Sequence, residues 1–194
     1  MIAGVDEAGR GPLAGPVVAA AVILSRRHGI RGIEDSKVLD PQTRHRLAAQ
    51  IRSGCIAYGV GWADAAEIDA LNILQATFLA MRRAILALPV GCTEFLVDGN
   101  RLPDFSGFAT TSVRAIVRGD ASEKCIGAAS ILAKTVRDTY MDHAHSIYPS
   151  YRFSDHKGYP TPVHRQLLAQ HGPCPLHRRS FAPVREVLSL QSAP

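Results

Sequence analysis

The spacing of apolar and polar residues predicts a chain that begins with strands and then alternates strands with helices. Short apolar runs bounded by turn residues are typical of strands, whereas apolar residues recurring every three or four positions are typical of helices. The predicted strands cover residues 2–5, 17–24, 56–62, 95–97 and 113–117, and we expect the last two to be buried. This order of elements favours an α/β domain with a mixed sheet.

Capping residues and periodicity predict five helices. Asp40-Pro41 supplies an N-cap and a proline at the first helical position, which starts a helix reaching about Ile51. Asp64 and Glu67 form the pattern of a capping box, and one long helix is predicted to follow it. Its apolar stripe consists of Leu71, Leu74, Phe78, Met81, Ile85 and Leu88, and it ends at Pro89 and Gly91. The remaining helices are predicted over 122–143, over 161–172 and, briefly, after Pro183.

The composition is that of an ordinary globular protein. The 194 residues, 46% hydrophobic and 20% charged, fit a single domain over 1–194. No run approaches the ~20 apolar residues of a membrane span, and the first residues lack the features of a signal peptide. We therefore expect a cytoplasmic monomer without membrane contact. The four widely spaced cysteines are interpreted as reduced thiols rather than zinc ligands.

The positive charge is concentrated in the last quarter of the sequence. Residues 1–149 hold 16 Lys and Arg against 15 Asp and Glu, whereas residues 150–194 hold 6 against 2. A basic extension attracts polyphosphate backbones, but a solvated basic tail explains the charge equally well. His156, His164 and His177 match no common metal-site spacing, so we interpret them as surface or phosphate-facing residues.

Acidic residues follow three of the predicted strands. Asp6-Glu7, Asp98 and Asp120 each come after a short apolar run and have a glycine one or two residues away. One such carboxylate is common in a solvated turn, but three strand ends that each deliver one favour a shared site for a hard cation. Adjacent strand residues point to opposite faces. Asp6 and Glu7 can therefore share one site only if the chain turns there.

Oxygen ligands select Mg²⁺ or Mn²⁺ over zinc or copper. Two such ions about 4 Å apart can activate a water and stabilise the leaving oxygen of a phosphodiester. No nucleophile elbow is present, and the glycine spacing in 9–15 does not match a nucleotide-binding loop. The chemistry of these residues points to a metal-dependent phosphodiesterase.

Several motifs in order along the chain resemble the ribonuclease HII family, the prokaryotic type 2 ribonucleases H. The opening motif is Asp6-Glu7-Ala8-Gly9-Arg10-Gly11-Pro12-Leu13-Ala14-Gly15. The later ones are Asp35-Ser36-Lys37, Leu71-Asn72-Ile73-Leu74, Asp98-Gly99-Asn100, Arg118-Gly119-Asp120, the segment 128–134, the segment 156–161 and Arg178-Arg179-Ser180-Phe181. Arg118 departs from the pattern, since lysine is usual there, but the charge is unchanged.

The resemblance implies a ribonuclease H-like fold, with a mixed five-stranded sheet flanked by helices and a small helical C-terminal extension over about 150–194 that contacts substrate. It implies an endoribonuclease that cuts the RNA strand of RNA/DNA hybrids and the 5′ side of single ribonucleotides in duplex DNA. The products would carry 3′-hydroxyl and 5′-phosphate ends, consistent with roles in ribonucleotide excision repair and RNA primer removal.

The resemblance also assigns roles to residues. Asp6, Glu7, Asp98 and Asp120 would hold two Mn²⁺ or Mg²⁺ ions during catalysis. Gly9, Arg10, Gly11 and Tyr159 would read the junction between a ribonucleotide and the following deoxynucleotide. Glycine allows close backbone approach to a sugar, and the 2′-hydroxyl distinguishes RNA from DNA. A further group of weaker candidates would contact phosphate or the metal shell: Lys37, Ser122, Lys134 and Lys157.

Two other classes of function remain open. A non-catalytic nucleic-acid-binding module would use the basic C-terminal region, and another nuclease of the same superfamily, such as a junction resolvase, would share the acids. No clear clamp-binding peptide is present in residues 190–194, so contact with a sliding clamp stays unproven.

Overall fold

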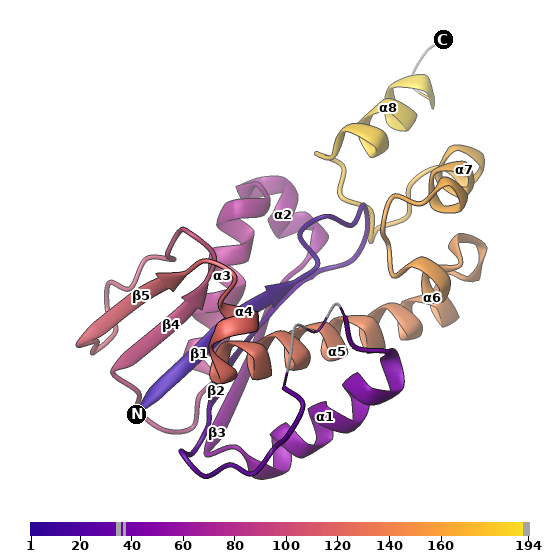
Figure 1. Ribbon diagram of the computed structural model, residues 1–194. Helices are drawn as coiled ribbons and strands as arrows, with labels where there is room; N and C mark the ends of the chain where they lie inside the picture. The colour runs from indigo at the N-terminus through magenta and orange to yellow at the C-terminus, as the bar shows by residue number, and fades with distance from the viewer. Residues whose placement is uncertain (34–35, 37, 192–194) are drawn as a thin grey trace.

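The chain folds around one mixed sheet with helices on both faces (Figure 1). The computed structural model describes residues 1–33, 36 and 38–191. The strands are β1 (Ile2–Ala8), β2 (Val17–Ile23), β3 (Ala57–Ala63), β4 (Glu94–Asp98) and β5 (Ser112–Ile116). Their order across the sheet is β3-β2-β1-β4-β5. The pairs β1–β2 and β2–β3 are antiparallel, and β1–β4 and β4–β5 are parallel. The predicted α/β class with a five-stranded mixed sheet is confirmed.

The apolar run of β2 is continuous because this strand is buried on both faces. Val17, Ala19 and Ala21 belong to the core under the helices α2 (Ala65–Leu71) and α3 (Ile73–Leu86). Ala20 and Val22 belong to the opposite core, formed with α1 (Pro41–Gly54) and α5 (Lys124–Ile147). Strand residues alternate between faces, so a strand packed on both sides loses its polar positions.

The remaining elements follow the sheet in sequence. The short helix α4 (Gly119–Ser122) connects β5 to α5. After α5 come the 3₁₀ turn η1 (Pro149–Tyr151), α6 (Phe153–His156), α7 (Pro162–His171) and α8 (Ala182–Gln191). These last elements lie beyond the end of the sheet at which β1 terminates (Figure 1). In the part of the chain that the structure describes, every helix is too short or too polar to cross a membrane.

Local signals placed most helix starts correctly. The Asp40 carboxylate accepts a hydrogen bond from the Thr43 N–H at 3.0 Å, which caps α1. The capping box is present too, because Glu67 N–H donates to Asp64 at 2.8 Å and Asp64 N–H to Glu67 at 3.1 Å. Each of these three hydrogen bonds joins residues three positions apart, within one turn of helix, so the local sequence carries the whole signal.

Two predicted elements differ in the structure. The single long helix after Asp64 is wrong, because Asn72 adopts a φ of 69° and separates α2 from α3. The Asn72 side chain accepts from the N–H groups of Leu74 and Gln75 and starts the second helix, which leaves Leu71 exposed. The strand over 113–117 is not buried either: β5 is an edge strand, and Val117 beyond it is 69% exposed.

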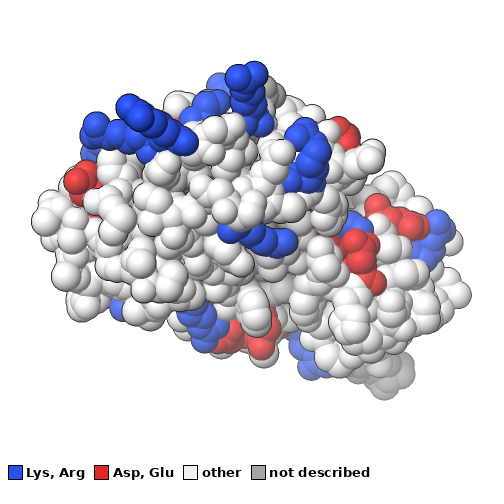
Figure 2. All heavy atoms as spheres, turned by 90° about the horizontal axis from the view of Figure 1, so that it is seen from below, with Lys and Arg blue, Asp and Glu red and all other residues white. Residues whose placement is uncertain are grey.

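Positive charge is spread over more of the surface than the sequence count suggested. Figure 2 shows Lys and Arg side chains in several separate groups on one face. Arg26, Arg27, Arg46 and Arg52, in the loop before α1 and on that helix, are exposed. In the C-terminal quarter, by contrast, Arg178 is fully buried. Substrate contact by residues 150–194 stays a prediction.

Candidate active site

The parallel pairing of β1 with β4 brings three of the predicted acids to one end of the sheet. Val5 is opposite Val97 in the register, so the next residues along the two strands are Asp6 and Asp98. The prediction that β1 ends before Asp6 is wrong, because the strand continues to Ala8 and its residues from Gly4 to Ala8 pair with β2. The side chains of Asp6 and Glu7 therefore start on opposite faces of the sheet.

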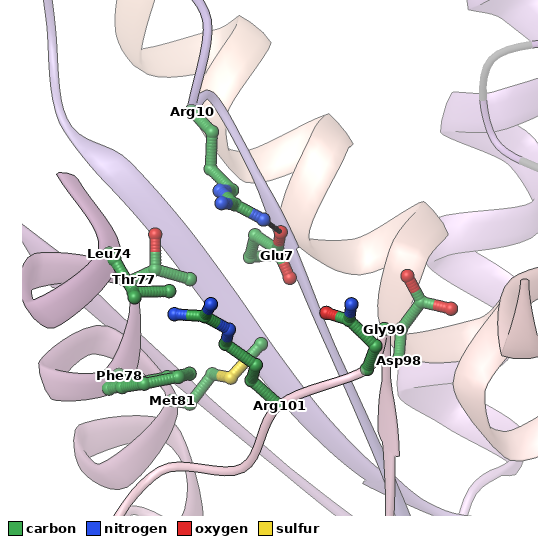
Figure 3. A pocket seen from close by; sticks show the side chains of 10 residues that line it. Glu7, Arg10, Leu74, Thr77, Phe78, Met81, Asp98, Gly99 and Arg101 are labelled. Atoms are coloured by element: carbon green, nitrogen blue, oxygen red, sulfur yellow. Dashed lines mark hydrogen bonds and ion pairs between the residues drawn. The ribbon is translucent and has the colours of Figure 1, made fainter. Parts of the chain in front are cut away.

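Two pockets meet at these acids. The tyrosine pocket is lined by Asp6, Glu7, Ala8, Gly9, Arg10, Gly11, Ser36, Asp98, Lys134 and Tyr159. The α3 pocket is lined by Glu7, Arg10, Leu74, Thr77, Phe78, Met81, Asp98, Gly99, Asn100 and Arg101 (Figure 3). Glu7, Arg10 and Asp98 belong to both pockets, whereas Asp6 lines only the first. Glu7 and Asp98 thus reach the shared opening from neighbouring strands.

Burial and mutual repulsion raise the free energy of the three carboxylates of Asp6, Glu7 and Asp98 when all of them are ionised. Burial raises the pKa of Asp6 well above its ordinary value, and the charges of Glu7 and Asp98 raise it further. Burial also raises the pKa of Glu7, against the opposing effect of Arg10, whose guanidinium lies 3.4 Å from the Glu7 carboxylate. Carboxylates that raise one another's pKa are stabilised together by a nearby cation.

Hydroxyl groups complete the surroundings of Asp6. Its carboxylate accepts a hydrogen bond from the Glu7 N–H at 2.7 Å and from the hydroxyl of Ser130 on α5. The Ser130 hydroxyl is also 2.8 Å from that of Ser36. Sequence reasoning gave neither serine a role, although both belong to the quoted family motifs.

Asp120 is tied to the cluster through its backbone. It lies on α4 and is 8% exposed. The Asp98 carboxylate accepts hydrogen bonds from the N–H of Gly119 at 2.7 Å and from that of Asp120 at 3.4 Å. Asp120 lines neither pocket. The structure therefore brings Asp6, Glu7 and Asp98 together and leaves Asp120 beside them.

The donor set fits a hard cation by its chemistry. Asp6, Glu7 and Asp98 offer only oxygen, as Mg²⁺ and Mn²⁺ require, and they are partly shielded from water. Among the residues that can be described, no three His, Cys, Asp or Glu side chains are already drawn together in the geometry of a metal site. An ion with water ligands and a substrate phosphate needs fewer protein ligands than a closed site.

The loop after β1 and the ring of Tyr159 form the other wall of the tyrosine pocket. Gly9 has a φ of 97°, in the region that favours glycine, and a Cβ there would overlap the Arg137 side chain. Tyr159 is 39% exposed. Its ring centroid lies 5.7 Å from the Lys134 Nζ and 5.8 Å from the Arg137 guanidinium carbon.

The weaker candidates separate into distinct surroundings. Lys134 lines the tyrosine pocket and donates to Asp138 at 2.7 Å, one helical turn along α5. Lys157 donates to Asp142 and to the Ser154 carbonyl, and Ser122 is exposed; neither residue lines the two pockets. Lys37 and Asp35 lie outside the described residues, so the predicted contact of Lys37 with substrate stays a prediction.

Three histidines predicted to be surface or phosphate-facing are buried, so that prediction is wrong. His164 and His177 are 0% and 2% exposed, and their Nε2 atoms are 3.1 Å apart. His164 Nδ1 donates to the Tyr159 carbonyl at 2.9 Å, and His177 Nδ1 accepts from the Cys174 N–H at 3.1 Å. His156 stacks on His164 with ring centroids 4.3 Å apart. Only the tertiary packing brings these separate residues together.

The sheet order, the flanking helices and the acidic end of β1 and β4 define a ribonuclease H-like α/β protein. The model of the ribonuclease HII family matches residues 3–184. A ribonuclease HII of Idiomarina loihiensis is 51% identical over 189 residues, which cover 97% of this chain and 99% of the relative. The chain belongs to the ribonuclease HII family and is a ribonuclease H enzyme.

Solved structures agree with the fold. The ribonuclease H2 of Pyrococcus horikoshii superposes with a TM-score of 0.84 at 26% identity, and the match covers 99% of both chains. Bst-RNase HIII, solved in complex with Mn²⁺, superposes with a TM-score of 0.76 at 19% identity over 98% of this chain and 70% of that protein. The ribonuclease H-like fold is therefore confirmed.

Proposed function

We propose that this protein hydrolyses the RNA strand of RNA/DNA hybrids and also cuts on the 5′ side of a single ribonucleotide in duplex DNA. One observation carries the proposal: the carboxylates of Asp6, Glu7 and Asp98 share a pocket with Gly9–Gly11 and Tyr159. That pocket places the groups suited to phosphodiester chemistry beside the groups suited to reading a sugar.

Asp6, Glu7 and Asp98 would hold divalent metal, with Asp120 as the fourth ligand. When bound, Mg²⁺ or Mn²⁺ in two positions supplies an activated water and stabilises the charge that develops on the phosphate. The Mn²⁺ complex of a protein with the same fold supports this choice of ion. The cation would neutralise the negative charge of these buried carboxylates, whose pKa values are raised without it. Its removal would restore the repulsion between the carboxylates.

The chain's own residues would position the substrate. Arg10 is exposed at the shared opening of the two pockets and can bind a phosphate oxygen. The Tyr159 ring can pack against the deoxyribose that follows the ribonucleotide, where a 2′-hydroxyl would crowd it. Water adds to phosphorus, the bond from phosphorus to the 3′-oxygen breaks, and that oxygen leaves as a 3′-hydroxyl opposite a 5′-phosphate.

The decisive experiment is an end-labelled DNA duplex with one ribonucleotide, incubated with Mg²⁺ or Mn²⁺. We expect a single cut on the 5′ side of the ribonucleotide and none in the matched all-DNA duplex. An RNA/DNA hybrid should be cut as well. Equal cutting of the all-DNA duplex contradicts the specificity, and cutting in excess chelator contradicts the metal requirement. Such an activity would serve ribonucleotide excision and primer removal.

Asp98→Asn separates this enzyme from a module that only binds nucleic acid. Asparagine keeps the shape of the side chain but loses the charge that faces Asp6 and Glu7. We expect cleavage to fall by more than about 100-fold, since even outer-shell changes at metal sites cost 10- to 100-fold. Duplex binding, measured by fluorescence anisotropy, should stay or tighten as repulsion falls. Unchanged cleavage would exclude a catalytic role for Asp98.

A further inference from the structure

Two buried arginines lie beneath the loop between β1 and β2. Arg178, in the segment between α7 and α8, and Arg137, on α5, are both 0% exposed. Within the described chain neither arginine forms an ion pair with a carboxylate. Burying a charge without an opposite charge is costly unless hydrogen bonds satisfy it. Backbone carbonyls accept hydrogen bonds from all three nitrogens of Arg178 and from Nε and Nη2 of Arg137, whereas no partner is found for Arg137 Nη1 among the described residues.

The carbonyls come from the loop that lines the tyrosine pocket. Arg178 donates from Nη2 to the Gly9 carbonyl at 2.6 Å, from Nη1 to that of Arg10 at 3.0 Å and from Nε to that of Gly15 at 2.9 Å. Arg137 donates to the carbonyls of Pro16 at 3.0 Å and Ala14 at 3.1 Å. Five carbonyls of one loop are thereby turned toward the interior.

The backbone of the C-terminal segment fixes Arg178 in this position. Ala14 and His177 form an antiparallel bridge. The N–H of Gly15 donates to the Leu176 carbonyl at 2.9 Å, and that of Arg178 to the Leu13 carbonyl at 2.8 Å. Figure 1 shows this segment passing beside the loop, far from it in sequence.

The orientation of the carbonyls determines where the N–H groups point. In a trans peptide the C=O and the N–H point in opposite directions. Because Arg178 draws the Gly9 and Arg10 carbonyls inward, the N–H groups of Arg10 and Gly11 face outward. Both residues are exposed, both line the tyrosine pocket, and neither N–H has a partner among the described residues. Two neighbouring N–H donors without a partner suit an oxygen acceptor.

We propose that Arg178 is a positioning residue for recognition of the ribose: it holds the loop so that the Arg10 and Gly11 N–H groups meet the 2′-oxygen of the ribonucleotide. This inference rests on the proposed function, because it concerns the same pocket. Arg137 supports the far end of the loop. Burial, and after it the positive charge of Arg137, lowers the pKa of Arg178 to about 9. The guanidinium therefore still carries its charge at pH 7.

Arg178→Lys tests the geometry while it keeps the charge. A lysine ammonium is a single point, so it cannot span three carbonyls as the planar guanidinium does. Binding is measured in the Asp98→Asn background, for duplexes that differ only in one 2′-hydroxyl. We expect the preference for the ribonucleotide duplex to fall by about five-fold or more, the value of one lost hydrogen bond. Affinity for the all-DNA duplex should change far less.

Arg185→Lys is the matched control, because this exposed arginine also donates to a carbonyl, that of Ser180, but lies outside the loop. It should keep the full preference. A folded Arg178→Lys protein, checked by circular dichroism, that also keeps the full preference overturns the proposal. If the parent protein itself shows no preference, the proposed function fails first, and the two failures are distinguishable.

A second measurement needs no change at Arg178. The backbone amide signals of Arg10 and Gly11 are followed by nuclear magnetic resonance in the Asp98→Asn protein. We expect the ribonucleotide duplex to shift both signals more than the all-DNA duplex does, with the exposed Gly91, between α3 and β4, as a reference. Equal shifts with the two duplexes would overturn the proposal even if Arg178→Lys failed to fold.

Discussion

Single residues in the tyrosine pocket combine chemistry that sequence motifs identify with contacts that they do not. The acids were identified as candidates by their recurrence at strand ends, and Asp6, Glu7 and Asp98 do lie together. The hydrogen bond between Asp6 and Ser130 and the carbonyl contacts of Arg178 join residues more than a hundred positions apart. The residue type therefore determines which chemistry a side chain can perform, and its neighbours determine its pKa and its orientation.

At the residue scale, the ring of Tyr159 rather than its hydroxyl should carry the substrate preference. No hydrogen bond of the hydroxyl is found within the described chain, whereas the ring faces Lys134 and Arg137. We expect Tyr159→Phe to keep the preference for the RNA–DNA junction and Tyr159→Ala to lose it, by about ten-fold, the cost of a lost stacking contact of roughly 1–3 kcal/mol.

The measurement is kcat/KM on a single-ribonucleotide duplex relative to a continuous RNA/DNA hybrid. A junction resolvase with the same acids would show no change of preference in either variant. Loss of preference in Tyr159→Phe to the same extent as in Tyr159→Ala would instead assign the role to the hydroxyl.

At the scale of elements, the site depends on how closely β1 approaches α5. Gly4 faces the start of α5, and a Cβ at this position would overlap the backbone of Cys125 and Ile126. Since α5 also carries Ser130, Lys134 and Arg137, the absence of a side chain at Gly4 sets the distance between the acids and these partners.

Gly4→Ala should destabilise the protein by about 1–3 kcal/mol, the usual cost of overpacking, or more. The clash is with backbone, which cannot rotate away as a flexible side chain can. Gly91→Ala is the matched control, because nothing lies within 4 Å of the added Cβ, and it should change stability by less than about 0.5 kcal/mol. Urea unfolding of both variants tests this; equal stability would contradict the close approach.

At the scale of the whole molecule, the C-terminal elements are fastened to the sheet by buried polar groups. His164 and His177 form a chain of hydrogen bonds from the Cys174 N–H to the Tyr159 carbonyl, which requires both rings to be neutral. Burial lowers the pKa of His164 to about 4, and burial with the neighbouring His164 lowers that of His177 to about 3. A third histidine, His156, whose own pKa burial lowers, also lowers the pKa of both rings.

Acid should therefore loosen this part of the molecule. Below pH 6.5 the unfolded chain binds protons on these histidines while the folded chain does not, so stability present above pH 6.5 is lost as the pH falls toward 4. The expected slope is up to about 1.4 kcal/mol per pH unit for each histidine. His177→Gln can still donate to His164 and should remove the part of the slope that His177 contributes, about half of that of the His164–His177 pair.

The measurement is urea unfolding of both proteins at pH 7, 6 and 5, with the difference between them isolating His177 from the raised pKa values of Asp6 and Glu7. His143→Gln, at an exposed position of α5, is the control and should follow the parent protein. A His177→Gln slope identical to that of the parent would show that His177 is not neutral in the folded protein.

The sequence by itself determined the elements and the chemistry of the site. Alternation and capping are local, so β2, α1 and the capping box of α2 could be predicted correctly. Asn72 shows the limit, because helical periodicity continued through it while its side chain capped a new helix. The edge position of β5 also depended on strand order, which no single segment encodes.

The tertiary structure decided how these residues cooperate. Parallel pairing of β1 with β4 placed Asp98 beside Asp6, and the C-terminal segment placed Arg178 beneath Gly9 and Arg10. The three histidines show the difference most clearly: their polarity favoured the surface, but hydrogen bonds to one another and to backbone groups of the packed C-terminal elements hold them inside. Burial and partner choice follow from packing of the whole chain, so a carboxylate, an arginine or a histidine acquires its role only there.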